Sequence, residues 1–125
     1  MISFNDIELN NKEPVYIQLC TYIKQRILLG NVRSKDTFPS RREIAASLGI
    51  NPNTVQKAFK LMEDEGFVIT QGNQGSILYL DEKILNKIEH ELTNKMVKEF
   101  IISSKAVGLS FKQTIDLISS LWDEK

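Results

Sequence analysis

One stretch, SRREIAASLGINPNTVQKAFKLMEDEG at residues 40–66, constrains the fold more than any other part of the chain. Ser40 and Glu43 have the spacing of a capping box, which begins a helix. Gly49 supplies the left-handed backbone that ends this helix. Asn51 followed by Pro52 has the cap and first-turn chemistry of a second helix. Two short helices joined by a glycine-containing turn predict a helix-turn-helix.

The second of these helices has two different faces. Its apolar residues recur at helical spacing and are expected to face a core: Val55, Ala58, Phe59 and Met62. Its opposite face carries amide and basic side chains: Asn53, Gln56, Lys57 and Lys60. An exposed helix face of this composition is suited to hydrogen bonding with base edges and to pairing with phosphates.

The segments on either side complete a small α+β domain. Residues 14–30 predict an amphipathic helix, and residues 2–9 are compatible with a short strand or an ordered arm. After Gly66 the pattern changes to two runs of strand formers, 67–69 and 77–80, around the loop QGNQG at 71–75. This pattern predicts a β-hairpin. Three helices followed by a hairpin, called the wing below, make a winged helix-turn-helix domain over residues 1–80.

Residues 81–125 predict a two-helix tail. Gly108 ends the first helix, and Ser110 with Gln113 forms a second capping box. The apolar stripe of the tail consists of Ile84, Leu85, Ile88, Leu92, Met96, Phe100, Phe111, Ile115, Ile118 and Trp122. The stripe could fold back on its own domain or pair with the same stripe of a second chain. Because a helix that is apolar over this length needs a partner surface, we expect dimerisation.

Composition excludes several other classes of protein. The formal net charge is zero, although residues 10–66 carry nine basic against six acidic residues. One cysteine, Cys20, allows no internal disulfide, and its apolar surroundings predict a buried thiol. No signal peptide and no membrane-length apolar run is present, so we expect a cytoplasmic protein. One histidine and one cysteine on separate elements provide no catalytic set, and we expect no enzyme, metal or cofactor. The acidic run 63–65 is interpreted as a solvated helix end.

Several separate motifs carry a family resemblance. They are PVYIQ at 14–18, FPSRREIA at 38–45, NPNTV at 51–55 and EDEG at 63–66, followed by the hairpin. In this order they resemble the GntR family of bacterial transcription regulators, and the short tail is similar to its YtrA-like subfamily. The resemblance implies a dimeric, operator-binding repressor, often of transport genes. At the wing the chain departs from the family, because Gln71, Gly72 and Gln74 stand where basic residues are common.

The candidate DNA-binding residues are Arg41, Arg42, Asn53, Thr54, Gln56, Lys57, Lys60, Gln71, Asn73 and Gln74. Arg42 aligns with the most characteristic DNA-contacting arginine of the family, and Arg41 is expected to bind a phosphate. Asn53, Thr54 and Gln56 are expected to reach bases or phosphates in the major groove, and the wing amides the minor groove.

Other roles remain open for these residues. The alternative for Asn53 and Thr54 is local capping of the helix, and for the basic residues a solvated surface. The predicted function is therefore sequence-specific binding of double-stranded DNA by a homodimeric repressor on a palindromic operator. The alternative is a winged helix that binds a protein, which the uncharged wing favours. An effector, if one exists, is not identified by the sequence.

Overall fold

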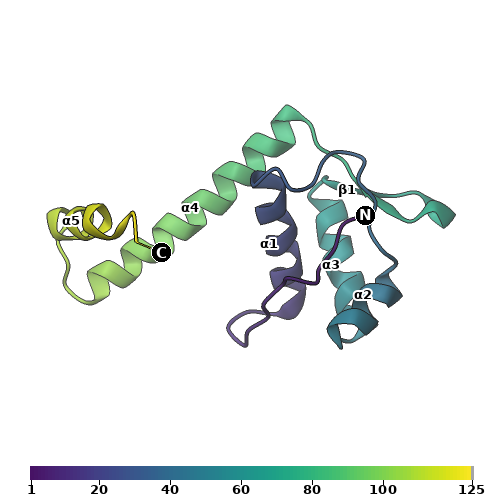
Figure 1. Cartoon of the computed structure of the whole chain (residues 1–125), viewed down its shortest axis with the longest axis horizontal. Coiled ribbons are helices and arrows are strands. Elements are labelled where there is room, and N and C mark those ends of the chain that lie inside the picture. The colour runs from purple at the N-terminus through teal and green to yellow at the C-terminus, as the bar shows by residue number, and fades with distance from the viewer. Residues whose placement is uncertain (125) are drawn as a thin grey trace. The chain divides into compact units, whose positions relative to one another are not determined.

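The computed structural model describes residues 1–124, except for the side chain of Gln74. The chain divides into two compact units, residues 1–89 and residues 90–125. The first unit contains α1 (Val15–Leu28), α2 (Arg41–Leu48), α3 (Pro52–Asp64), β1 (Val68–Thr70), the short 3₁₀ helix η1 (Gly72–Gln74) and β2 (Ser76–Leu78) (Figure 1). The predicted α+β winged helix-turn-helix fold is confirmed.

The helix-turn-helix forms because its local signals agree. Ser40 Oγ accepts from the Glu43 N–H at 3.1 Å, and the Glu43 carboxylate accepts from the Ser40 N–H at 3.3 Å. Gly49 lies in the left-handed region, with φ of 66°. Asn51 Oδ1 accepts from the backbone N–H of Asn53 at 2.8 Å, and Pro52 is the first residue of α3. These contacts fix where both helices begin and where α2 ends, as the sequence predicted.

The core of the first unit lies where α3 packs against α1, α2 and β1. Its largest fully buried side chains come from α1, α3, the turn after α3 and β2: Phe59, Phe67, Leu19, Ile23, Met62, Leu78 and Val55. Cys20 is buried among them and donates from Sγ to the carbonyl oxygen of Ala58 at 3.4 Å. Burial raises the pKa of the Cys20 thiol to about 12, so the group stays protonated and unreactive at neutral pH. The predicted buried thiol is confirmed.

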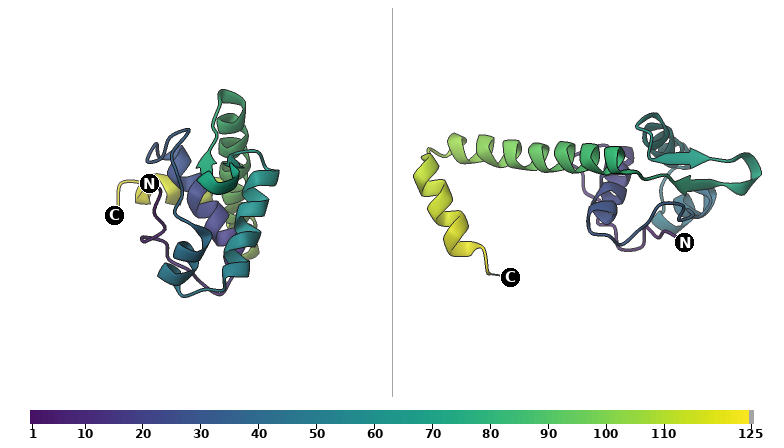
Figure 2. Two further views of the ribbon diagram at one scale, coloured as in Figure 1. Left: turned by 90° about the vertical axis from the view of Figure 1, so that its right-hand side faces the viewer. Right: turned by 90° about the horizontal axis from the view of Figure 1, so that it is seen from above.

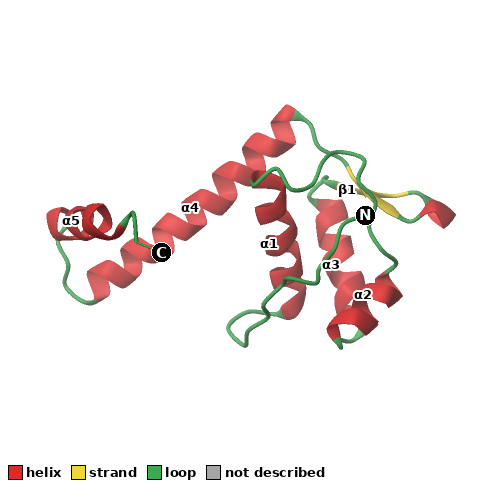
Figure 3. Ribbon diagram, viewed as in Figure 1, coloured by secondary structure: helices red, strands yellow, loops and turns green. Residues whose placement is uncertain are grey.

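The first nine residues form an ordered arm without strand structure, which resolves the two alternatives left open by the sequence (Figure 3). Ile2 and Phe4 alternate with exposed residues, and both side chains are buried in the core. The Ile2 N–H donates to the Thr37 carbonyl at 2.8 Å, and the Phe4 ring stacks on Tyr22 with centroids 5.7 Å apart. The arm therefore belongs to the folded domain.

The wing is an antiparallel pair in which Val68 lies opposite Leu78 and Thr70 opposite Ser76. Figure 2 shows the hairpin projecting from the helical part of the first unit. The second edge of β2 is held by the connector before α2. The Lys35 N–H donates to the Leu78 carbonyl at 2.8 Å, and the Phe38 N–H donates to the Ser76 carbonyl at 3.0 Å. Strand β2 is thus hydrogen-bonded along both edges, to β1 on one side and to the connector 35–38 on the other.

Helix α4 (Glu82–Ala106) begins in the first unit, which changes two of the predicted interface residues. Ile88 is only 3% exposed and belongs to the core of the first unit, and Ile84 is half-buried against that core. The division after residue 89 thus comes nine residues later than the predicted boundary at 80. The reason is that Ile84 and Ile88 of the stripe pack on the chain's own core, while Leu85 between them stays exposed. Ile88 is consequently unavailable for contact with a second chain.

The second unit contains the remainder of α4 and α5 (Phe111–Leu121). Its turn follows the prediction: Gly108 has φ of 83°, and Ser110 and Gln113 form a reciprocal capping box. No residue that the structure describes in α5 is buried. Large apolar side chains stay exposed throughout this unit, among them Met96, Val97, Phe100, Ile101, Ile102, Phe111, Ile115, Leu117, Leu121 and Trp122. No helix in the described part of the chain combines the length and apolar character needed to cross a membrane.

Candidate nucleic-acid interface

One face of α3 presents a row of polar side chains to solvent. Asn53, Gln56, Lys57 and Lys60 are all exposed, at the i, i+3, i+4 and i+7 spacing that keeps them on one side of a helix. The opposite side is buried in the core through Val55, Ala58, Phe59 and Met62. The core therefore fixes the rotation of α3 so that its amide and basic residues face outward, as predicted.

The first turn of α3 leaves Asn53 available. Asn51, outside the helix, provides the cap, so the Asn53 side chain is exposed and makes no hydrogen bond within the described structure. Local capping, the alternative interpretation of Asn53, is therefore performed by Asn51. Thr54 is half-buried in the same turn. The exposed N-terminal turn of a helix also favours a negative group such as a phosphate.

The two adjacent arginines of α2 have different environments. Arg42 is exposed and forms no hydrogen bond or ion pair with the residues that the structure describes. Arg41 is held within the domain: its guanidinium donates to Gln56 and Thr70 and lies over the Phe59 ring. Part of the Arg41 guanidinium is thus already engaged within the domain, unlike that of Arg42, and its binding of a phosphate stays a prediction.

Two lysines on α3 remain accessible. Lys57 Nζ lies 4.2 Å from the centroid of the Tyr16 ring on α1, and the residue is exposed. Lys60 Nζ lies 3.7 Å from an Asp64 carboxylate oxygen, with both side chains more than half exposed. An exposed pair of this kind is worth well under ~1 kcal/mol, so it does not prevent Lys60 from exchanging Asp64 for a phosphate.

The tip of the wing is polar and uncharged. Gln71 and Asn73 are exposed, whereas the predicted contact residue Gln74 has a side chain outside the described structure. In the strand pair next to this loop, Thr70 Oγ1 and Ser76 Oγ lie 2.8 Å apart, and Thr70 also accepts from Arg41. Sequence analysis did not single out Thr70 or Ser76. The sequence indicates this pair only weakly, as two hydroxyl residues at equal distances from the turn.

The acidic run at the end of α3 is more involved in packing than predicted. Glu65 pairs with Lys24 of α1 at 2.7 Å, with side chains 25% and 15% exposed, and Glu63 lies 3.5 Å from Arg41. Only Asp64 of the three is exposed. Each carboxylate faces a basic residue. Within residues 1–124, no cluster of three or more metal-ligating side chains occurs.

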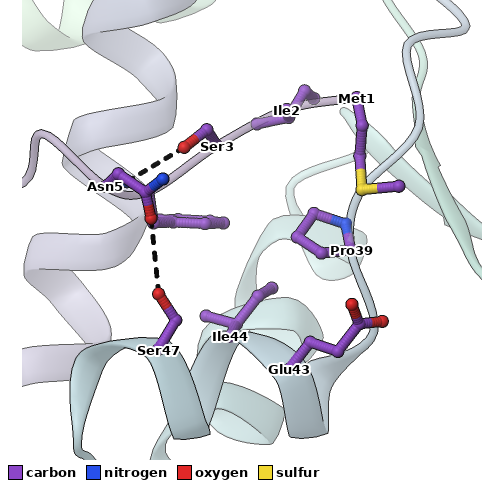
Figure 4. Close-up of a pocket in the computed structure, with 9 residues that line it drawn as sticks. Met1, Ile2, Ser3, Asn5, Pro39, Glu43, Ile44 and Ser47 are labelled. Atoms are coloured by element: carbon purple, nitrogen blue, oxygen red, sulfur yellow. Dashed lines mark hydrogen bonds between the residues drawn. The ribbon is translucent and has the colours of Figure 1, made fainter.

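An open groove of about 300 Å³ lies between the N-terminal arm and α2 (Figure 4). Several of its polar groups already have partners within the chain. Asn5 Oδ1 accepts from Ser47 Oγ at 3.3 Å, Ser3 Oγ accepts from the Asn5 N–H at 3.1 Å, and Glu43 belongs to the capping box. The groove therefore reflects how the arm packs against α2.

Comparisons with known proteins agree with this geometry. A family model described as bacterial regulatory proteins, gntR family, matches residues 15–78, which span all three helices and the hairpin. The chain belongs to the GntR family. GntR-family proteins are DNA-binding transcription regulators and not enzymes, so the predicted family and the absence of an enzymatic role are confirmed.

Relatives of this GntR-family protein match it over nearly its whole length. It is 28% identical to the HTH-type transcriptional regulator YhcF of Bacillus subtilis, over 92% of this chain and 95% of YhcF. It is 29% identical to the transcriptional repressor YtrA of the same organism, over 92% of this chain and 89% of YtrA. A solved GntR family transcriptional regulator from Listeria monocytogenes aligns with a TM-score of 0.79 and 25% identity, covering 90% and 98% of the two chains.

Proposed function

We propose that this GntR-family regulator binds a specific operator in double-stranded DNA as a homodimer and represses the genes beside it. The observation that carries the proposal is the outward row of Asn53, Gln56, Lys57 and Lys60 on α3, beside an unengaged Arg42 on α2. The repressor YtrA, which matches almost the full chain, supports repression as the regulatory outcome. A transport operon is the target class that the family resemblance implies.

The chemistry divides between bases and backbone. In a helix-turn-helix the first turns of the second helix enter the major groove, where Asn and Gln side chains pair with base edges. Arg42 supplies a planar fork that suits guanine or a phosphate. Lys57, Lys60 and the N-terminus of α3 supply positive charge for the phosphate backbone. The wing amides contact the minor groove, whose base edges offer mainly acceptors.

The second unit supplies the reason for a dimer. Two helices bury too little apolar surface to make a core of their own, and α5 buries no described residue. An apolar hollow of about 420 Å³ between α4 and α5 is lined by Phe100, Leu109, Thr114, Leu117, Ile118, Leu121 and Trp122. A second copy carries the same apolar surface, and pairing by two-fold symmetry would cover both at once. Two recognition helices then meet successive major grooves of a palindromic operator.

Analytical ultracentrifugation over a concentration series tests the dimer. Phe111 is 82% exposed, so Phe111→Glu removes apolar surface without disturbing the unit itself. We expect at least about a tenfold weaker self-association, because burying a phenylalanine is worth about 1.5–3 kcal/mol. Leu29→Glu, at a residue 68% exposed in the first unit, is the matched control and leaves association unchanged. A wild-type chain that sediments as a monomer throughout would exclude the dimer.

Fluorescence anisotropy with the chain's own upstream promoter, against a scrambled duplex, tests DNA recognition. We expect the promoter to bind ~10³-fold or more tightly than the scrambled duplex. The logarithm of the affinity should fall linearly with that of salt, by about 0.9 for each phosphate neutralised. Equal binding to both duplexes, together with a protein partner recovered on the same domain, would favour the alternative of a protein-binding winged helix.

A further inference from the structure

Arg41 occupies a junction between three elements of the first unit. From the first residue of α2, one guanidinium nitrogen donates to Gln56 Oε1 on α3, and the other donates to Thr70 Oγ1 on β1 at 3.1 Å. The second nitrogen also lies 3.5 Å from a Glu63 carboxylate oxygen, and the guanidinium carbon lies 4.9 Å from the centroid of the Phe59 ring. The Arg41 side chain is 28% exposed. Its fork and its charge are thus directed toward the protein.

The contacts continue into the wing. Thr70 Oγ1 and Ser76 Oγ form a hydrogen bond of 2.8 Å across the two strands, and Ser76 is buried. A continuous series of polar contacts therefore runs from Gln56 through Arg41 and Thr70 to Ser76. It joins the DNA-facing side of α3 to both strands of the wing.

This junction determines which end of the Gln56 amide faces outward. Arginine carries hydrogen-bond donors and no acceptor, so the amide must turn its oxygen toward Arg41. The Gln56 NH₂ group is then the end left for DNA. An unconstrained glutamine pairs with adenine through one donor and one acceptor, N6–H₂ and N7 on the base edge. A glutamine that presents its NH₂ suits an edge with two acceptors, which is guanine O6 and N7.

From this geometry we infer that Arg41 is a positioning residue for base recognition, which fixes Gln56 as a hydrogen-bond donor selective for guanine over adenine. The inference rests on the proposed entry of α3 into the major groove. In this role Arg41 holds Gln56 instead of a phosphate, since Gln56, Thr70 and Glu63 all lie against its guanidinium. Lysine cannot replace it, since a single ammonium group lacks the planar fork that reaches both partners.

The test uses the full-length chain and a panel of operator duplexes in which each guanine is replaced in turn by adenine. We expect the wild type to prefer guanine by about tenfold at the base pair that Gln56 faces, the size of one good base contact. Gln56→Ala removes this preference. Arg41→Met and Arg41→Lys both reduce it to about one or reverse it, because the released amide can then pair with adenine. The double variant Arg41→Met with Gln56→Ala matches Gln56→Ala in base preference.

Salt dependence separates positioning from phosphate binding. If Arg41 only positions Gln56, Arg41→Met keeps the wild-type slope of log affinity against log salt. A slope lower by about 0.9, restored by Arg41→Lys, would show a phosphate contact and overturn the inference. An unchanged guanine preference in Arg41→Met would also overturn the inference. So would a wild-type base preference in Gln56→Ala, a variant that leaves the other Arg41 contacts intact. A wild type that binds promoter and scrambled DNA equally would instead refute the proposed function itself.

Discussion

Truncation of Phe4 to alanine should destabilise the first unit by about 3 kcal/mol. The ring is 4% exposed, and burying a phenylalanine is worth about 1.5–3 kcal/mol. Its stacking on Tyr22, with centroids 5.7 Å apart, adds about 0.5–1.5 kcal/mol. Ile2 is also buried, and its N–H is bonded to the Thr37 carbonyl. The arm therefore stays packed on the domain in the variant. The cavity left by the Phe4 ring then remains, because the arm does not detach to remove it.

Urea unfolding followed by far-UV circular dichroism measures this effect. With an m value of about 1–3 kcal/mol/M, the midpoint should fall by roughly 1–3 M. Trp122 is the only tryptophan and lies in the second unit, so its fluorescence reports that unit separately. Protein concentration must be held constant, because association shifts apparent stability. Glu8→Ala, an exposed substitution on the same arm, should stay within about 0.5 kcal/mol of wild type. An equally small effect for Phe4→Ala would refute the assignment of the arm to the core.

Three further outcomes follow from other features. Arg42→Ala should weaken operator binding by ~1–3 kcal/mol in anisotropy titrations. The control Lys105→Ala, which removes a charge from the second unit, should leave the affinity unchanged. Equal losses of affinity in both variants would contradict a specific role of Arg42. Ser40→Ala breaks the capping box with Glu43 and should lower the free energy of unfolding by about 1 kcal/mol in urea titrations. Burial raises the folded pKa of Cys20 from 9.0 to about 12, so above pH 9 only the unfolded chain loses this proton and stability falls. Relative to Cys20→Ala, the free energy of unfolding of the wild type should fall by about 1 kcal/mol more between pH 8 and pH 10. An equal pH dependence in the two proteins would exclude the buried thiol as the cause of the fall.

The parts of the fold that sequence predicted are those decided within a few residues. The capping box at Ser40, the left-handed Gly49 and the Asn51 cap each depend on neighbours no more than four residues away, and all formed as expected. The outward row on α3 followed from helical periodicity alone, because every apolar position of that helix is used by the core.

The parts that sequence missed depend on contacts between distant residues. Arg41 and Thr70 are 29 residues apart, and nothing local distinguishes Arg41, which is held, from Arg42, which is exposed. Ile88 continues a uniform apolar stripe, so its burial in the first unit could be learned only from the packing of that unit. The docking of Phe4 likewise depends on Tyr22 and Phe38, which come from two other segments.

The double bracing of β2 makes the hairpin a modular part of the domain. Backbone hydrogen bonds from β1 and from the connector 35–38 hold its base, while the loop 71–75 lies beyond them. Changes in loop length or chemistry therefore leave the bracing in place, since exposed loop tips are where chains tolerate insertion. Loops transplanted from other winged-helix proteins offer a way to alter groove preference while the helices keep their own base contacts.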